Sequence, residues 1–369
     1  MRSITEYGGL SRLKDFKTLY DGKSILLVTG KQSFESSGAK HVCLKLFKSQ
    51  QVVQFMDFEV NPKINDAIKG AELAKEHAVD VIISIGGGSV LDTAKLVKAF
   101  YHARGNEVAL VKGLDHVADP SIPLIAVPTT AGSGSEATHF AVVYIGSEKY
   151  SLASQCLLPD AVVLDGSLVK SSSKYLKTCN ALDAMAQAIE SFWAEGATSE
   201  SRKFALSAIE LGWKIFGEFI SEKCSAVTAQ QMIEAANQAG RAINVSKTTA
   251  PHAWSYAFTS LKGIPHGHAV WLTLPTIFEL HYERSRDRDP YFRSNMNQLC
   301  KALNLEPKSE KSSQLRRYLL DFGIAYDFAH LKTDVSERKA LSSSVNMERM
   351  KNNPISFSTE EINQIFELL

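Results

Sequence analysis

Short apolar runs of strand type alternate with helical patterns through the first part of this chain, and this alternation restricts the fold more than any other feature. The strand-type runs are SILLVTG, VVQFMDF, DVIISIGGG and PLIAVPTT, and the helical patterns are INDAIKGAELAKEHA and VLDTAKLVKAFYH. Such alternation predicts a parallel sheet flanked by helices. A second patch rich in β-type residues, AVVYIG, KYSLAS and AVVLD, is expected to complete this domain with some antiparallel pairing.

The later part of the chain has a different pattern. The strand signal fades beyond about Asp165, and successive amphipathic helices follow from Asn180 onward. A chain of 369 residues also exceeds the size at which single cores stop growing, so two domains are expected. We predict an α/β domain over residues 1–168 and an all-helical domain over 169–369, with the functional site in the cleft between them.

Composition excludes several classes of protein. A hydrophobic content of 44%, a charged content of 22% and a net charge of +1 are ordinary for a globular enzyme and argue against a nucleic-acid or membrane-surface role. The five cysteines are scattered and lack CxxC spacing, so reduced thiols are expected rather than disulfides or a zinc ribbon. No apolar segment at the start of the chain, or of about 20 residues elsewhere, indicates a signal peptide or membrane span, so a cytoplasmic protein is expected.

Two loops rich in small residues follow strand-type runs. In ISIGGGSVLDTAK, Gly86, Gly87 and Gly88 allow close approach of an anion, and the next helix is expected to begin at Ser89 with Asp92 closing a capping box. A triple glycine alone is equally typical of a tight turn between strand and helix. The second loop, VPTTAGSGSEAT, offers the hydroxyls of Thr129, Thr130 and Ser133. Both loops would meet at the carboxyl edge of one parallel sheet, which favours a nucleotide site.

Four later residues have the character of metal ligands. Asp183 and Gln187 are four residues apart in NALDAMAQAIES, so on a helix they project from one face. His252 in TTAPHAWSY and His266 in GIPHGHAV add imidazoles. Gln187 is unexpected there, because an amide oxygen holds iron, zinc or nickel less well than imidazole does. It is interpreted as a ligand, as a hydrogen-bond donor to one, or as a polar residue of a site that no longer holds metal.

With these motifs together, the chain resembles the iron-containing (group III) alcohol dehydrogenases, relatives of dehydroquinate synthase and glycerol dehydrogenase. The resemblance covers nearly the whole chain and rests on GGGSVLDTAK, PTTAGSGSEAT, LPDAVVLD, the helix of Asp183, and the spacing of His252 and His266 (266 − 252 = 14). It implies a Rossmann-like N-terminal domain for NADPH or NADH, a helical C-terminal domain with one divalent metal (Fe2+, or Zn2+ or Ni2+), and a homodimer. It also implies a role near the nicotinamide for Lys149.

The chain departs from the family pattern at three positions. Gln187 replaces a metal histidine, and Tyr256 stands where many members have a further histidine. Gly30 replaces an aspartate after the first strand, which removes a carboxylate that would bind the adenosine ribose and repel a 2′-phosphate. Because the adjacent Lys31 is able to pair with that phosphate, NADPH becomes more plausible than NADH.

Several segments, VTGKQSFESSGA, SKTTAPHAWSYAFTS, GIPHGHAV and RMKNNP, resemble the branch that contains phosphonoacetaldehyde reductases. A phosphonate dianion needs cations, and Lys247, Arg241 and Lys262 are the candidates, with the solvated-surface alternative open for Lys247. Tyr256 and His268 are candidate proton donors, although packed structural roles are equally compatible with the sequence.

The predicted function is metal-assisted reduction of a small aldehyde to an alcohol by NAD(P)H, with phosphonoacetaldehyde as a candidate substrate. Two alternatives remain open. One is another reaction on the same scaffold, of the dehydroquinate synthase or polyol dehydrogenase type. The other is a catalytically silent nucleotide-binding protein that lost its metal through Gln187.

Overall fold

The computed structural model describes residues 4–118, 122–306, 309–324, 327, 331, 333–343 and 349–367. The chain forms two compact units. Unit 1 comprises Met1–Ser172 and Cys224–Asn237, and unit 2 comprises Ser173–Lys223 and Gln238–Leu369. The division therefore assigns 224–237 to the first unit, whereas the sequence-based boundary at 168 left this segment in the second.

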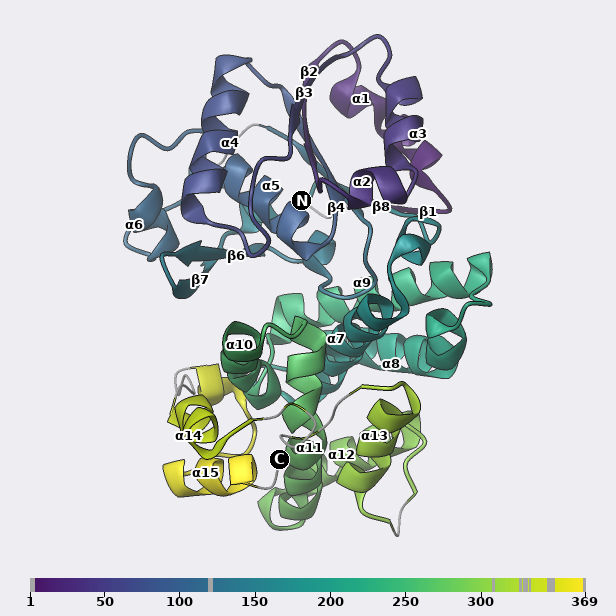
Figure 1. Ribbon diagram of the computed structural model, residues 1–369, viewed down its shortest axis with the longest axis vertical. Helices are drawn as coiled ribbons and strands as arrows, with labels where there is room; N and C mark the ends of the chain where they lie inside the picture. Colours follow the sequence, from purple (N-terminus) through teal and green to yellow (C-terminus); the bar gives the residue numbers. More distant parts are fainter. Residues whose placement is uncertain are drawn as a thin grey trace. The chain divides into compact units, whose positions relative to one another are not determined.

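Unit 1 is built on a six-stranded sheet in the order β1-β8-β5-β4-β2-β3, and every pairing in it is parallel (Figure 1). The predicted α/β class is confirmed. The chain runs from β2 outward to β3 and then returns past β2 to β4, so the direction of winding reverses between β2 and β4. The strands are β1 (Ile4–Tyr7), β2 (Ser24–Thr29), β3 (Gln51–Phe55), β4 (Val81–Gly86), β5 (Leu124–Pro128) and β8 (Ala161–Leu164).

Both faces of this sheet are covered, which explains why its strands are almost uniformly apolar. On β2, Leu26 and Val28 belong to one hydrophobic cluster, and Ile25 and Leu27 belong to the other. The first cluster contains buried residues of α4 and α5, and the second contains those of η1 and α3. The helices of unit 1 are η1 (Leu10–Phe16), α1 (Lys17–Tyr20), α2 (Ser33–Ser36), α3 (Ala39–Leu46), α4 (Ile64–Glu76), α5 (Gly88–Phe100), α6 (Glu107–Val111), η2 (Ser135–Ala137), η3 (Gln155–Leu157) and η4 (Leu168–Ser171).

The expected antiparallel pairing is confirmed, but it lies outside the main sheet. β6 (Phe140–Ile145) and β7 (Glu148–Ala153) form a separate two-stranded sheet, while the AVVL segment joins the parallel sheet as β8.

The first part of α9 (Ala226–Ser246) belongs to unit 1, although it comes much later in the sequence than the rest of that unit. The amide of Gly166 donates to Gln230 Oε1 at 2.8 Å, and Asn237 Nδ2 donates to Glu136 Oε1 at 3.0 Å. A Cβ atom at Gly166 would lie 2.4 Å from the backbone nitrogen of Gln230, so only glycine allows this approach.

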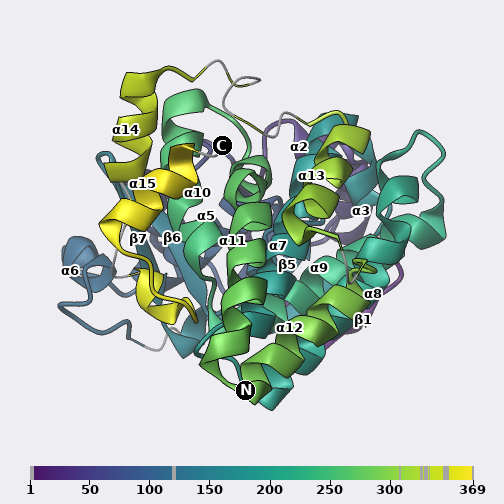
Figure 2. The same ribbon diagram turned by 90° about the horizontal axis from the view of Figure 1, so that it is seen from below.

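Unit 2 is helical, as predicted. Its central helix α7 is buried along most of its length, and α11 packs against α7, α10 and α12 (Figure 2). The helices are α7 (Lys174–Trp193), α8 (Ser199–Ile220), the end of α9, α10 (Ala250–Lys262), α11 (His266–Arg288), α12 (Pro290–Ala302), α13 (Lys311–Asp321), α14 (Val335–Ser343), η5 (Arg349–Asn352) and α15 (Thr359–Glu367).

Close contact between α7 and α11 depends on a glycine at the start of α11. A Cβ atom at Gly267 would lie 1.9 Å from the carbonyl oxygen of Cys179, so any larger residue would separate the two helices. Trp271 then donates from Nε1 to the carbonyl of Leu182 at 2.7 Å. These contacts fix His266 and His268, which flank Gly267, against α7.

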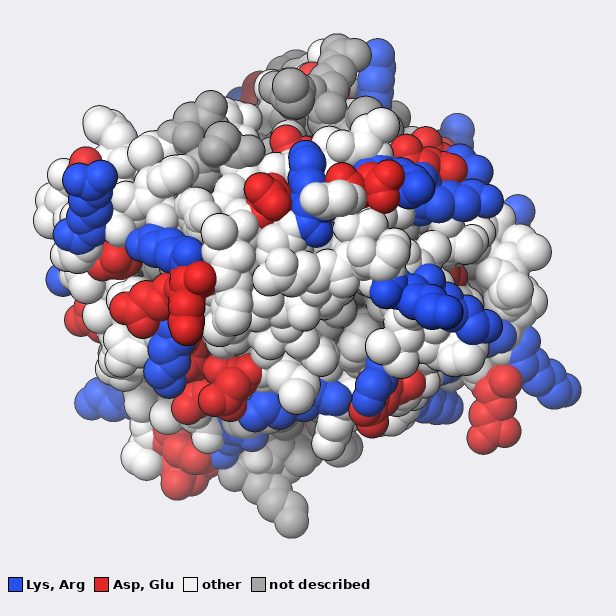
Figure 3. Space-filling view, turned by 90° about the horizontal axis from the view of Figure 1, so that it is seen from above, with Lys and Arg blue, Asp and Glu red and all other residues white. Residues whose placement is uncertain are grey.

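Three general features of the structure bear on membrane spans, surface charge and thiols. Among the described residues, no helix combines the length and the apolar character that a membrane crossing requires. On the face shown in Figure 3, positive and negative side chains are interspersed rather than gathered into patches of one sign. All five cysteines are free thiols, as expected.

Candidate metal and cofactor sites

Three predicted ligands converge in unit 2. Asp183 lies in the middle of α7, His252 in the first turn of α10, and His266 at the first residue of α11. One ligand atom from each lies within 4.8 Å of the others, a spacing that would allow all three to hold a single metal ion. His252 Nε2 and Asp183 Oδ1 are 3.3 Å apart.

The donor set is suited to a divalent transition metal. Asp183 Oδ1 and His252 Nε2 are buried, and neither makes a well-aligned hydrogen bond to any described residue. Buried polar atoms without partners are costly, and a metal ion between them would satisfy both. One carboxylate and two imidazoles are ligands that iron, zinc and nickel accept.

Charges within the site perturb its titration. Burial acts to lower the pKa of His252, but the carboxylates of Glu190 and Asp183 outweigh it and raise the pKa to about 10. Burial acts to raise the pKa of Asp183, but His252 and His266 outweigh it and lower this pKa. The two groups therefore favour the charged pair when only protons compete for the site.

Glu190 holds His252 from the side opposite Asp183, and the sequence interpretation missed it. Its Oε1 atom bonds His252 Nδ1, and its Oε2 atom accepts from the backbone and the hydroxyl of Thr249 at 2.7 and 2.8 Å. Trp193 Nε1 completes the network by donating to the Thr249 hydroxyl at 2.8 Å. Glu190 follows Asp183 by seven residues on α7, and this same-face spacing was the available signal.

Gln187 lies one turn after Asp183 on α7 and is 4% exposed. Its side-chain amide donates a hydrogen bond to Asp183 and contributes to the lowered pKa of that carboxyl. This contact places Gln187 at the triad. Direct metal coordination by Gln187 remains a prediction.

The two candidate proton donors occupy different surroundings. The Tyr256 ring stacks on His266, with centroids 5.6 Å apart and 8° between the planes. His268 is buried, and its Nδ1 atom lies 2.9 Å from the hydroxyl of Tyr175, a residue that the sequence interpretation did not single out. Tyr175 was missed because it lies at the start of α7, 93 residues from His268.

The two glycine-rich loops meet in unit 1 at the carboxyl ends of β4 and β5. The amide of Thr129 donates to the carbonyl of Gly86 at 2.9 Å. A Cβ atom at Gly87 would lie 3.3 Å from Thr130, and one at Gly88 would lie 2.8 Å from Ser133. The predicted convergence of the loops is therefore present, and β4 borders the switch point of the sheet, where open α/β sheets bind ligands.

The predicted capping box is wrong. α5 begins at Gly88 with Gly87 as its N-cap and has no side-chain cap. Asp92 instead accepts from Ser135 Oγ at 2.5 Å and from the amide of Val142 at 3.0 Å, so it connects α5 to the second loop and to β6. Ser89 Oγ accepts from the amide of Asn61 at 3.2 Å.

Buried charges surround Asp92. Burial raises the pKa of Asp92, and Lys95 and Lys149 oppose that rise, so the β7 residue Lys149 acts electrostatically at the start of α5. Burial lowers the pKa of Lys95 to about 8, although Asp92 and Glu136 act to raise it.

Gly30 and Lys31 follow β2 on the other side of the switch point. Lys31 Nζ lies 3.2 Å from Asp57 Oδ1, and both side chains are exposed. Asp57 follows β3, so a carboxylate is present near this edge although it is absent at position 30. A Cβ atom at Gly30 would meet Ser33 Oγ at 2.4 Å.

The three cations predicted for the substrate anion lie in unit 2 and have different surroundings. Lys262 forms an ion pair with Glu337 at 2.5 Å. The Arg241 guanidinium lies 5.8 Å from the centroid of the Phe204 ring. Lys247 is exposed and directly follows α9.

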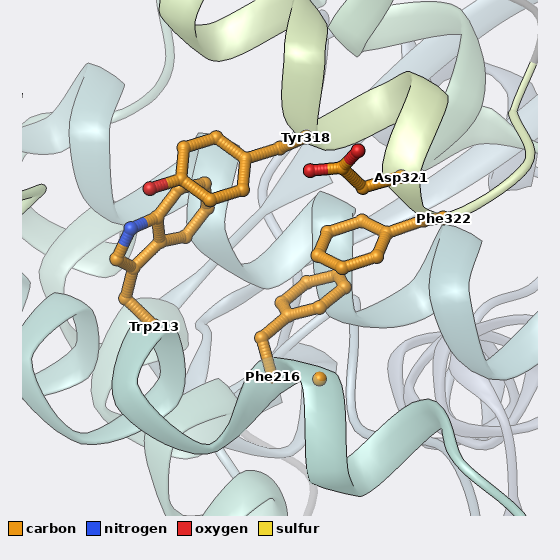
Figure 4. A pocket seen from close by; sticks show the side chains of 6 residues that line it. Trp213, Phe216, Tyr318, Asp321 and Phe322 are labelled. Atoms are coloured by element: carbon orange, nitrogen blue, oxygen red, sulfur yellow. The ribbon is translucent and has the colours of Figure 1, made fainter.

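An aromatic cavity of about 220 Å³ lies between α8 and α13 and includes none of the predicted site residues. Figure 4 shows Trp213 next to Tyr318 and Phe216 next to Phe322, with Asp321 close to Tyr318 and Phe322.

A parallel α/β sheet with converging glycine-rich loops and an Asp-His-His triad are features of metal-dependent dehydrogenases, enzymes of the oxidoreductase class. Two family descriptions cover almost the whole chain: "Iron-containing alcohol dehydrogenase" over residues 2–166 and "Fe-containing alcohol dehydrogenase family, C-terminal" over 178–369. The chain belongs to the iron-containing alcohol dehydrogenase family. Members of this family reduce aldehydes to alcohols with NAD(P)H and a divalent metal.

Similar curated proteins include three reductases or dehydrogenases. The chain is 31% identical to the probable alcohol dehydrogenase EutG of Escherichia coli over 62% of its own length and 58% of that protein. It is 27% identical to the NADPH-dependent butanol dehydrogenase of Clostridium saccharobutylicum over 98% and 94%, respectively. It is 29% identical to the phosphonoacetaldehyde reductase of Streptomyces viridochromogenes over 78% and 75%.

A solved structure confirms the fold. The sulfoacetaldehyde reductase of Bifidobacterium kashiwanohense, in complex with NAD+, superposes with a TM-score of 0.88 and 23% identity over 100% of this chain and 96% of that one.

Proposed function

We propose that this enzyme reduces a small aldehyde carrying an anionic group, with phosphonoacetaldehyde as the leading substrate, to the corresponding alcohol. The observation that carries the proposal is the convergence of Asp183, His252 and His266. The named activities of two similar proteins, on phosphonoacetaldehyde and on sulfoacetaldehyde, support an aldehyde with an anionic group.

Unit 2 would hold the metal through Asp183, His252 and His266, with Gln187 as a fourth ligand. A divalent ion held by these residues would supply Lewis-acid chemistry at the carbonyl group, and a bound nicotinamide would supply the hydride. Glu190 fixes the ring orientation of His252 by bonding Nδ1, which leaves Nε2 directed to Asp183. Tyr256 or His268, or water, gives the product oxygen its proton.

Unit 1 would hold the dinucleotide at its glycine-rich loops. Gly86, Gly87 and Gly88 and the start of α5 present backbone amides to the pyrophosphate. Thr129, Thr130 and Ser133 add hydroxyls, and Lys149 adds a cation near Asp92. Preference for NADPH would follow from Gly30 and Lys31: the Lys31 ammonium group would leave its ion pair with Asp57 and pair with the 2′-phosphate.

The decisive assay is oxidation of NADPH by metal-replete protein with phosphonoacetaldehyde, and with propanal as an aldehyde that lacks the anion. We expect a large advantage in kcat/KM for phosphonoacetaldehyde. Equal, weak rates with the two aldehydes would support a dehydrogenase but contradict a preference for the anionic substrate. Repeating the assay with NADH tests the cofactor preference.

The metal role has its own test. His252→Ala should abolish turnover and leave the circular dichroism spectrum unchanged, and full activity in this variant would refute the role. Metal analysis of protein purified without chelator separates the reductase from a silent nucleotide-binding protein. A homodimer and a cytoplasmic location are part of the proposal, and sedimentation and cell fractionation test them.

A further inference from the structure

Lys247 has an unusual backbone conformation. Its φ is 61°, in the left-handed region that glycine and asparagine tolerate and lysine disfavours. Such conformations persist only where the surrounding structure determines them, and they cluster at functional sites.

Asn352 holds the backbone on both sides of Lys247. Its Nδ2 atom donates to the carbonyl of Ser246 at 2.8 Å and to the carbonyl of Thr248 at 2.9 Å. Asn352 is itself fixed, because its carbonyl accepts from the amide of Glu195 and its Oδ1 atom accepts from the amide of Gly196, both at 3.0 Å.

The neighbouring loop is shaped for this contact. A Cβ atom at Gly196 would lie 3.2 Å from both Asn352 Oδ1 and the carbonyl oxygen of Ser246. A larger residue at position 196 would therefore push against Asn352 and the turn that it holds. The turn of Ser246, Lys247 and Thr248 is thus fixed from two distant parts of the chain.

The same turn is attached to the helix that carries Asp183. Ser246 Oγ donates to Ser191 Oγ at 2.7 Å, and the amide of Thr249 donates to Glu190 Oε2 at 2.7 Å. Because Glu190 also bonds His252, the backbone of Lys247 is in a fixed relation to the metal triad.

The charge of Lys247 is available for a ligand. Its side chain is exposed, and no carboxylate among the described residues lies within 4.0 Å of its ammonium group. Lys262, by contrast, is only 13% exposed at its side chain and pairs with Glu337. Of these two lysines, Lys247 is the one able to pair with a substrate anion without losing a partner.

We propose that Asn352 is a positioning residue for substrate specificity. It holds Lys247 in the left-handed conformation, so that the ammonium group of Lys247 pairs with the phosphonate or sulfonate group of the aldehyde. This inference rests on the proposed function. It adds that the Lys247 ammonium group selects the anionic substrate and that Asn352 positions Lys247.

The first test compares Lys247→Gln, Asn352→Ala and the double variant, with Lys262→Gln as the matched control. A charge-assisted hydrogen bond corresponds to roughly a tenfold change in an equilibrium constant or more. We expect Lys247→Gln and Asn352→Ala each to raise KM for phosphonoacetaldehyde about tenfold and to change KM for propanal less than about twofold. Lys262→Gln should leave the ratio of the two constants unchanged.

The double variant separates positioning from a general structural effect. If Asn352 acts through Lys247, Asn352→Ala should add nothing to KM for phosphonoacetaldehyde in the Lys247→Gln background. Additive effects, or equal losses with propanal, would overturn the positioning role. Lys247→Gln alters an exposed side chain, so it tests the anion contact even if Asn352→Ala does not fold.

Stability provides an independent readout. Lys247→Gly removes the strain, so it should raise the melting temperature while losing the preference for the anionic aldehyde. A more stable Lys247→Gly variant that keeps its substrate preference would show that Lys247 has no role in recognition.

Binding of the product distinguishes this inference from the proposed function. Calorimetric titration with 2-hydroxyethylphosphonate in the presence of NADP+ requires no turnover, and we expect Lys247→Gln and Asn352→Ala to weaken this binding about tenfold. Absence of binding to the unaltered enzyme would overturn the inference. Reduction of both aldehydes by unaltered enzyme, with no effect of either substitution, would overturn the inference and leave the reductase function intact.

Discussion

Protonation of His281 should destabilise unit 2 in mild acid. His281 lies on α11 and is 0% exposed. Its Nε2 atom lies 3.1 Å from Asn353 Nδ2, a donor, and its ring packs against Trp193 with centroids 4.6 Å apart. Burial lowers the pKa of His281 to about 3, and the positive charges of Arg288 and Arg284 add to the effect. A protonated ring would place two donors against each other in a buried position.

The direction and size of the change in the free energy of unfolding follow from the linkage between protonation and folding. The unfolded pKa of histidine is about 6.5, so between about pH 6.5 and pH 3 the unfolded state binds more protons than the folded state. The free energy of unfolding therefore falls as the pH falls through this window, with a slope that approaches about 1.4 kcal/mol per pH unit. Between pH 7 and pH 5, the contribution of His281 is about 2 kcal/mol.

The assay is guanidinium denaturation at pH 7, 6 and 5, followed by tryptophan fluorescence. All four tryptophans, at positions 193, 213, 254 and 271, lie in unit 2, so the signal reports that unit. His281→Gln keeps an acceptor toward Asn353 and removes the titrating group. Between pH 7 and pH 5, the free energy of unfolding of this variant should therefore fall by about 2 kcal/mol less than that of the unaltered protein. Parallel pH dependences for the two proteins would refute the reasoning.

Three further outcomes are expected. Gln187→His should tighten Zn2+ binding about tenfold or more, because imidazole is a better ligand than an amide oxygen, and competition with a chromophoric chelator measures it. Glu190→Gln should weaken Zn2+ binding about 10- to 100-fold in the same assay, with unchanged circular dichroism, because His252 loses the carboxylate that orients it; unchanged affinity would contradict this role. Gly88→Val should raise KM for NADPH with little effect on Zn2+ affinity, because its side chain would collide with Ser133, whose Oγ lies only 2.8 Å from a Cβ at that position.

Much of the fold follows from local patterns in the sequence. The runs that became β2, β4 and β5 are apolar on both faces, and a strand with both faces buried in a parallel sheet produces such a run. The convergence of the two glycine-rich loops followed from the same argument, since parallel strands end at one edge. The separate β6–β7 sheet could not be predicted in this way, because strand patterns do not specify which sheet a hairpin joins.

The errors and omissions at the sites arise from contacts between distant residues. Asp92 has the spacing of a capping residue, but its carboxylate bonds Ser135, which is 43 residues away. Helical spacing could have identified Glu190, because Glu190 lies on the same face of α7 as Asp183. Asn352 lies in the segment RMKNNP, but no local pattern indicates its contact with Ser246, which is 106 residues away in the chain.

The packing of α9 against Gly166 and Glu136 has a consequence during synthesis. The last segment of unit 1 is translated after Lys223, so the unit is incomplete when residue 172 leaves the peptidyl-transferase centre, and 65 further residues (237 − 172) are needed. At about 5–20 residues per second, this delay lasts seconds, which is long compared with the folding of a small α/β domain. Nascent chains of this enzyme should therefore present an unfinished surface to ribosome-associated chaperones until Asn237 emerges.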